Sequence, residues 1–154
     1  MSYPSELIAK YFQKIANSEG KTLTHMKIQK LVFFAHGVHL AAFGGPLINE
    51  EVKAWKFGPV IPELYDRLYK FGSSIVNLDI NDENLTALED DNNAEESIRV
   101  VWKVYGSNSA WTLSEISHRK ESPWDIVWNQ LGNTFSTIPN SLIEDYYKKF
   151  VTTN

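Results

Sequence analysis

An uncharged segment from Leu31 to Asn49 constrains the fold of this chain more than any other feature. Its first part, Leu31–Phe43, has apolar residues on almost every side of an α-helix, and Gly44-Gly45-Pro46 ends it. At ~1.5 Å per residue this helix spans about 20 Å, which is short of the ~30 Å hydrocarbon layer of a membrane. It also carries two histidines. We therefore expect a core helix of a soluble protein, with neighbours on several sides.

The rest of the chain shows the same helical periodicity. A stripe of apolar residues at helical spacing follows Pro4, and Thr24 is a plausible N-cap of the central helix. The segment Asn77–Glu96 is acidic and reads mostly as a solvated loop, with a short helix near Glu83–Leu88. The further predicted helices are 4–17, 62–71, 94–105, 113–118, 123–130 and a C-terminal one at about 139–151.

Residues 47–60 break this pattern. Val52 and Ala54 alternate with polar neighbours, and we expect a turn at Gly58-Pro59, in an extended connector or short β-hairpin. No repeat or linker divides the 154 residues. The chain is therefore predicted to be a compact, single-domain, all-α helical bundle of about six to eight helices, residues 1–154 forming one domain.

Composition excludes several classes of protein. The chain has no cysteine, which rules out disulfides, cysteine-ligated metals and thiol catalysis. Its net charge of −4 disfavours direct nucleic-acid binding, and no helix-turn-helix is recognisable. The N-terminus has no basic region followed by an apolar one, so we expect a cytoplasmic protein without a membrane partner.

Signals for catalysis and for metal binding are weak. His36 and His39 are spaced to share an ion on one helix, but no third ligand has a recognisable spacing; the alternative is that both cap polar edges of the helix. Ser114 and Ser117 lie close to His118 in sequence, but neighbours in a helix point apart. Nucleophile elbows and phosphate-binding loops are missing. We therefore expect that the protein is not an enzyme and that it has no cofactor and no metal site.

Two patches carry unusual side chains. The connector places Trp55, Lys56 and Phe57 outside any predicted helix, where the aromatic rings are either interface anchors or fold back over the core. In the second patch, Ser122 is a plausible N-cap of a helix that opens at Pro123. For Trp124, packing into the core is favoured over exposure.

In these patches the sequence resembles the SocA-like antitoxin domain, also called the Panacea domain. The resemblance extends over roughly residues 7–128, and residues 73–94 have no counterpart in it. Ser117 departs from the family pattern, in which Thr is more usual before the histidine. The matching segments are Lys27–Gly37, Pro46-Leu47, Ala54–Tyr65, Leu113–His118 and Ser122-Pro123-Trp124.

The resemblance implies a bacterial or prophage antitoxin that neutralises a separately encoded protein toxin by direct binding. Two alternatives stay open: an adaptor that delivers the toxin to a ClpXP-type protease, and an enzyme that reverses toxin action. The acidic stretch Glu89–Glu96 is a candidate for steering the association with a basic toxin. The residues expected in or near the toxin-binding surface are Trp55, Lys56, Phe57, Gly58, Pro59, Tyr65, His118 and Trp124.

Overall fold

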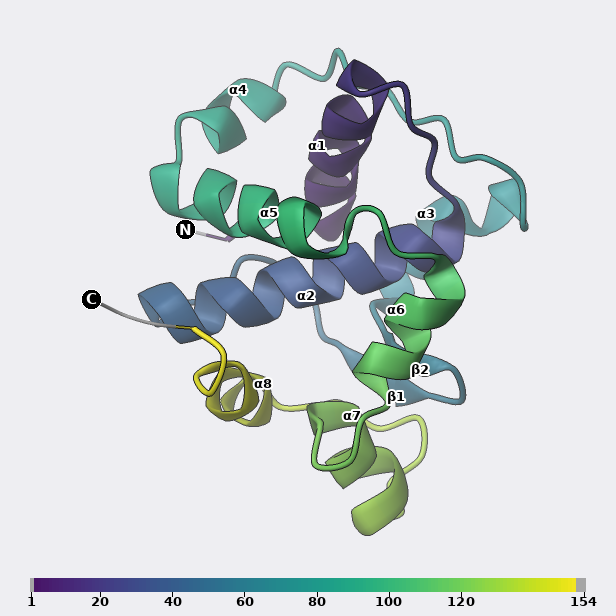
Figure 1. The fold of residues 1–154 in the computed structure, drawn as a ribbon, viewed down its shortest axis with the longest axis vertical. Coiled ribbons are helices and arrows are strands. Elements are labelled where there is room, and N and C mark those ends of the chain that lie inside the picture. Colours follow the sequence, from purple (N-terminus) through teal and green to yellow (C-terminus); the bar gives the residue numbers. More distant parts are fainter. Residues whose placement is uncertain (1, 152–154) are drawn as a thin grey trace.

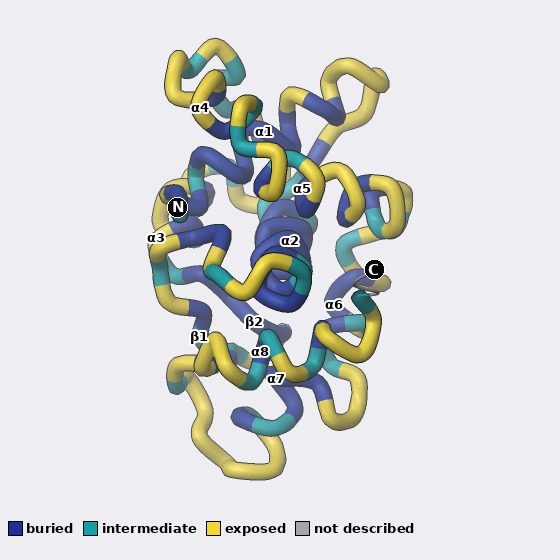
Figure 2. Tube along the Cα trace, turned by 90° about the vertical axis from the view of Figure 1, so that its left-hand side faces the viewer, coloured by how far each residue is buried: buried dark blue, intermediate teal, exposed yellow. Residues whose placement is uncertain are grey.

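A single long helix organises the computed structural model, which describes residues 2–151. Helix α2 (His25–Phe43) lies in the middle of the molecule (Figure 1), and Figure 2 looks along it, with most of its residues buried. Thr24 precedes it in extended conformation, and Gly44 ends it with a left-handed backbone (φ 75°). The expectation of a central helix with neighbours on several sides is confirmed.

The other helices surround α2 on two sides (Figure 1). On one side lie α1 (Ser5–Ser18), α4 (Leu85–Glu89) and α5 (Asn92–Tyr105). On the other lie α7 (Pro123–Asp125), η2 (Ile126–Gln130) and α8 (Asn140–Tyr147). The elements α3 (Pro62–Leu68), η1 (Tyr69–Phe71) and α6 (Ala110–Ser117) complete the bundle. With eight α-helices in the described residues and one small hairpin, the predicted all-α class is confirmed.

Helix positions follow from local chemistry. The apolar stripe of α1 is buried, and polar side chains cap three later helices. Asp91, Ser109 and Ser122 each accept a hydrogen bond from a backbone N–H in the first turn that follows. The predicted role of Ser122 as an N-cap is confirmed.

The hairpin corrects one detail of the sequence interpretation. Strands β1 (Lys53–Trp55) and β2 (Gly58–Val60) are antiparallel, so the turn lies at Lys56-Phe57 and not at Gly58-Pro59. Pro59 is tolerated in β2 because its partner Ala54 directs both its backbone groups to the other side. There the Ala54 N–H donates to the Ser136 carbonyl, and the Ala54 carbonyl accepts from the Phe135 N–H.

Two C-terminal segments also differ from expectation. The helix predicted at 123–130 is α7 followed by one π-helical turn, closed by the Leu131 N–H donating to the Ile126 carbonyl. The helix predicted at 139–151 ends at Tyr147, because the Lys149 and Phe150 N–H groups bond three residues back and tighten the chain into turns. Within residues 2–151, no helix combines the length and the hydropathy that crossing a bilayer requires.

Candidate binding site at the hairpin

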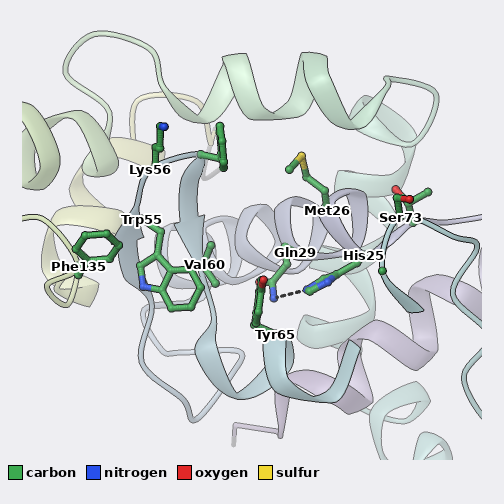
Figure 3. Close-up of a pocket in the computed structure, with 12 residues that line it drawn as sticks. His25, Met26, Gln29, Trp55, Lys56, Val60, Tyr65, Ser73 and Phe135 are labelled. Atoms are coloured by element: carbon green, nitrogen blue, oxygen red, sulfur yellow. Dashed lines mark hydrogen bonds between the residues drawn. The ribbon is translucent and has the colours of Figure 1, made fainter. Parts of the chain in front are cut away.

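A cavity of about 620 Å³ opens beside the hairpin (Figure 3). Three elements surround it: the start of α2, the two strands with their turn, and α3. Phe135, a loop residue that hydrogen-bonds to β1 from a distant part of the chain, also lines it, as do Gly72 and Ser73 after η1. The apolar side chains in the lining are Met26, Trp55, Phe57, Val60, Tyr65 and Phe135. Concave, mostly apolar surfaces of this size are typical of binding sites.

Aromatic rings make one wall of this hairpin pocket. The ring centroids of Trp55 and Tyr65 lie 5.2 Å apart in an edge-on arrangement, and Tyr65 also lies 4.8 Å from the His25 ring. Figure 3 shows Tyr65 between Trp55 and His25. Trp55 and Tyr65, both singled out from the sequence, are therefore brought into contact by the fold.

Gln29 contributes to the pocket lining and was not singled out from the sequence. Its Oε1 accepts from the Ile61 N–H at 3.0 Å, and its Nε2 donates to the Ile61 carbonyl at 3.3 Å, which ties α2 to the start of α3. The same amide lies 3.3 Å from the His25 Nε2. Burial lowers the pKa of His25, so this ring is neutral at pH 7. In the sequence, Gln29 could have been recognised as a candidate because it is a polar residue within the apolar stripe of α2.

The turn of the hairpin forms the outer rim. Phe57 is 56 % exposed, and the Lys56 ammonium lies 5.6 Å from the centroid of its ring. Trp55 is half-buried, whereas Gly58 and Pro59 are buried. The sequence left two alternatives for the aromatic rings of the connector: exposure as interface anchors, or packing over the core. Phe57 is exposed, and Trp55 is intermediate between the two.

The second sequence patch lies against the same hairpin. The indole N–H of Trp124 donates to the Trp55 carbonyl at 2.6 Å, and the His118 ring stacks on Trp124 with centroids 4.1 Å apart. Trp124 is buried, as the sequence favoured. Residues separated by about seventy positions along the chain thus form one structural unit, with the exposed turn on its outside.

Buried polar side chains of α2 and α6 anchor the hairpin through hydrogen bonds. The Lys30 ammonium donates to the Pro59 carbonyl at 3.2 Å, and the Ser114 hydroxyl donates to the Phe57 carbonyl at 2.9 Å. Lys30 is only 1 % exposed, and burial lowers its pKa to about 8. Burial also lowers the pKa of His118, whose Nε2 is enclosed without a hydrogen-bond partner among the described residues. These contacts pre-organise the hairpin.

The remaining histidines and serines have structural partners. The His36 Nδ1 accepts from the Leu47 N–H at 3.2 Å, and the His39 Nδ1 lies 2.6 Å from the Gly45 carbonyl. The Ser117 hydroxyl donates to the Ser114 carbonyl, so it is not directed at His118 as a nucleophile would be. Within residues 2–151, no three His, Cys, Asp or Glu side chains are grouped to hold a metal ion.

The sequence of the chain is also similar to a known protein family. The sequence model described as "Antitoxin SocA-like, Panacea domain" matches residues 28–125, which include the hairpin, α3, α6 and Trp124. The chain is also 33 % identical over 136 residues to the Antitoxin SocA of Caulobacter vibrioides (strain NA1000 / CB15N), covering 82 % of this chain and 72 % of that protein. No solved structure matches it significantly.

Proposed function

Because the chain belongs to the SocA-like antitoxin, Panacea domain family, we propose that it is the antitoxin of a bacterial or prophage toxin–antitoxin system and that it neutralises its cognate protein toxin by direct binding. The observation that carries the antitoxin role is the similarity to Antitoxin SocA over most of both chains. Family membership also supports a toxin as the partner.

We assign the toxin-binding surface to the hairpin face. Its contacting residues are Trp55, Lys56, Phe57 and Tyr65, which line or rim the pocket. The buried residues behind them act through the backbone that they hold. These supporting residues are Gly58, Pro59, His118 and Trp124.

The physical argument for this surface is pre-organisation. Aromatic side chains supply large contact areas while losing little conformational freedom, which is why they dominate the energetics of protein interfaces. Here the hairpin that carries Phe57 is tied to α2 by Lys30, which bonds to Pro59 in β2, and to α6 by Ser114, which bonds to Phe57 in the turn. A partner that binds this rim therefore meets a surface whose ordering is largely complete before association.

Co-expression with the product of the adjacent open reading frame tests the proposal. We expect growth rescue and a stable, near-equimolar complex that co-purifies. Phe57→Ala should weaken the complex about tenfold or more if this ring is an anchor. Phe150→Ala is the matched control, since Phe150 is similarly exposed at 62 % and lies outside the pocket lining; this variant should bind as the wild type does.

Other outcomes would contradict direct neutralisation. Rescue without a complex, with toxin disappearing only while a ClpXP-type protease is present, would identify an adaptor. Rescue at far less than one antitoxin per toxin would identify an enzyme. If the product of the adjacent open reading frame is harmless when expressed alone, it is not the toxin, and its pairing with this chain is rejected.

A further inference from the structure

The hairpin pocket has a charge pattern that differs from that of the whole chain. The chain carries 19 acidic residues and a net charge of −4, yet no Asp or Glu is among the described residues that line this pocket. In the same described lining, Lys56 is the only Lys or Arg. Its ammonium makes no ion pair with any carboxylate of residues 2–151, whereas Lys10, Lys14 and Lys148 each do. As far as residues 2–151 define it, the pocket is therefore mostly apolar, with one lysine at its rim that makes no ion pair.

Hydrogen-bond donors in the pocket are also free. The indole N–H of Trp55 and the hydroxyl of Tyr65 have no hydrogen-bond partner among the described residues, and both side chains line the cavity (Figure 3). The Gln29 amide, in contrast, is occupied by Ile61 and His25. Free donors and a cation in the same lining, without a carboxylate among the lining residues, favour a ligand group with acceptor oxygens and negative charge.

Size and wall chemistry specify the apolar part of the ligand. A volume of about 620 Å³ accommodates more than one aromatic ring, and the rings of Trp55, Tyr65 and Phe135 offer edges and faces to such a group. Tyr65 and Trp55 already meet edge-on at 5.2 Å, so their positions are defined before a ligand enters.

We infer that this pocket accepts an aromatic side chain of the toxin, with an acidic side chain beside it in the toxin's sequence. The ring packs against Trp55, Tyr65 and Phe135, and the carboxylate reaches the Lys56 ammonium. The inference rests on the proposed function for the partner being a protein, and it specifies the chemistry of the segment that docks. Charge complementarity selects this occupant over a basic or purely apolar segment.

Three small probes test the pocket without the toxin. In ¹H–¹⁵N NMR titrations of the full chain, N-acetylphenylalanine should shift the Trp55 indole N–H and bind about two- to fivefold more tightly than N-acetylphenylalaninamide at low salt. N-acetylglycine, which has the carboxylate and no ring, should not bind. Equal affinity for the acid and the amide, or no shift at the Trp55 indole with either, would overturn the inference.

Matched variants separate the charge from the ring site. Lys56→Gln should remove the preference for the acid over the amide, and Lys103→Gln, an exposed lysine of α5 outside the lining, should keep it. Tyr65→Ala should weaken the binding of both aromatic probes. Tyr65→Phe should retain the binding of the amide if the hydroxyl serves the carboxylate. An unchanged acid preference in Lys56→Gln would contradict the assignment.

The toxin complex distinguishes this inference from the proposed function. If the wild type binds the toxin and Lys56→Gln and Tyr65→Ala bind it equally well, the pocket inference fails. The assignment of Lys56 and Tyr65 to the toxin-binding surface fails with it, whereas direct neutralisation of the toxin stands. If the wild type does not bind the toxin, direct neutralisation fails. A concentration-dependent dimer that Tyr65→Ala abolishes would assign the pocket to a second copy of this chain and overturn the inference.

Discussion

At Gly58 the backbone passes so close to buried polar side chains that only a hydrogen atom fits on its Cα. A Cβ there would lie 2.8 Å from the Ser117 Oγ and 3.1 Å from both the His118 Nε2 and the Lys30 Cε. The residue also has φ +118°, which L-residues rarely adopt. Each neighbour comes from α2 or from the end of α6, so the steric part of this requirement arises from packing with distant elements, and the positive φ adds a local part.

Gly58→Ala should therefore destabilise the protein by about 2 kcal/mol or more, since backbone strain and overpacking act together. Gly44→Ala is the control, because Gly44 has a positive φ of 75° with no atom within 4 Å of the added Cβ, and it should cost only about 1 kcal/mol. Urea unfolding monitored by tryptophan fluorescence measures both. Equal losses in the two variants would contradict the packing argument.

His36 is a buried base that folding keeps neutral. Its Nδ1 accepts from the backbone N–H of Leu47, and its Nε2 lies 3.0 Å from the Asn140 Oδ1. Burial lowers its pKa from 6.5 to about 4, although the Asn140 contact opposes this. Between these two values the unfolded chain binds a proton that the folded chain does not. The contribution of His36 is thus complete above pH 6.5 and falls as the pH drops toward 4.

From pH 7 to pH 5 this linkage should remove about 2 kcal/mol of unfolding free energy in the wild type. His36→Gln should be less stable at pH 7, because its side chain cannot make both contacts, and should lose less on going to pH 5. Urea titrations at several pH values give the two slopes. Parallel slopes would show that His36 does not control the acid sensitivity.

At the scale of elements, the contact of α2 with α8 depends on a glycine inside a helix. The Tyr147 ring packs directly on Gly37, where a Cβ would approach the Tyr147 Cδ2 to 2.5 Å. The Phe33 ring meets the same tyrosine, with centroids 6.1 Å apart. Glycine in a helix interior is unfavourable by itself, so its presence here reflects the close approach of the two helices.

Gly37→Ala tests this contact through the sign of its effect. Helix propensity alone predicts a gain of about 1 kcal/mol, whereas the collision with Tyr147 predicts a net loss of about 1 to 3 kcal/mol. In a Tyr147→Ala background the same change should become neutral or stabilising. A double-mutant cycle by chemical unfolding measures the coupling. A loss of similar size in both backgrounds would mean that Tyr147 is not the cause.

At the scale of the whole molecule, the acidic segment is partly neutralised by the fold. Asp82 pairs with Lys10 at 2.9 Å, and Glu89 pairs with Lys14 at 2.6 Å, which attaches this segment to α1. Asp90 and Glu96 are exposed and have no ion pair among the described residues. The charge available for steering a basic toxin is therefore smaller than the sequence implies.

Association with the toxin should still slow as salt rises if this segment steers it, because exposed charges are screened beyond about 10 Å at 0.1 M salt. We expect the on-rate to fall severalfold between about 50 and 500 mM NaCl, and to fall less in an Asp90→Asn/Glu96→Gln double variant. Stopped-flow or biosensor kinetics measure these rates. On-rates that do not change with ionic strength would refute the steering hypothesis.

Local chemistry made most elements of the fold predictable. The apolar stripe of α1, the end of α2 at Gly44 and the N-cap Ser122 each depend on residues within one or two helical turns. The predicted position of the hairpin turn was wrong. Pro59 is a common turn residue, but here it is tolerated within a strand because its partner Ala54 hydrogen-bonds to residues 135–136 instead. The members of the candidate site were partly predictable, since exposed aromatic residues outside helices are unusual.

The amino-acid sequence was enough to predict the all-α class, the central helix, the family and the two patches that carry unusual side chains. Three features became visible only in the tertiary structure: Trp124 supports the strand of Trp55, Gln29 ties α2 to α3, and the pocket beside the hairpin has one lysine without an ion pair within residues 2–151. Helix formation depends on neighbours a few positions away, so its pattern is visible in a sequence. A pocket is formed by residues far apart in the chain, and their contacts exist only after the core has packed.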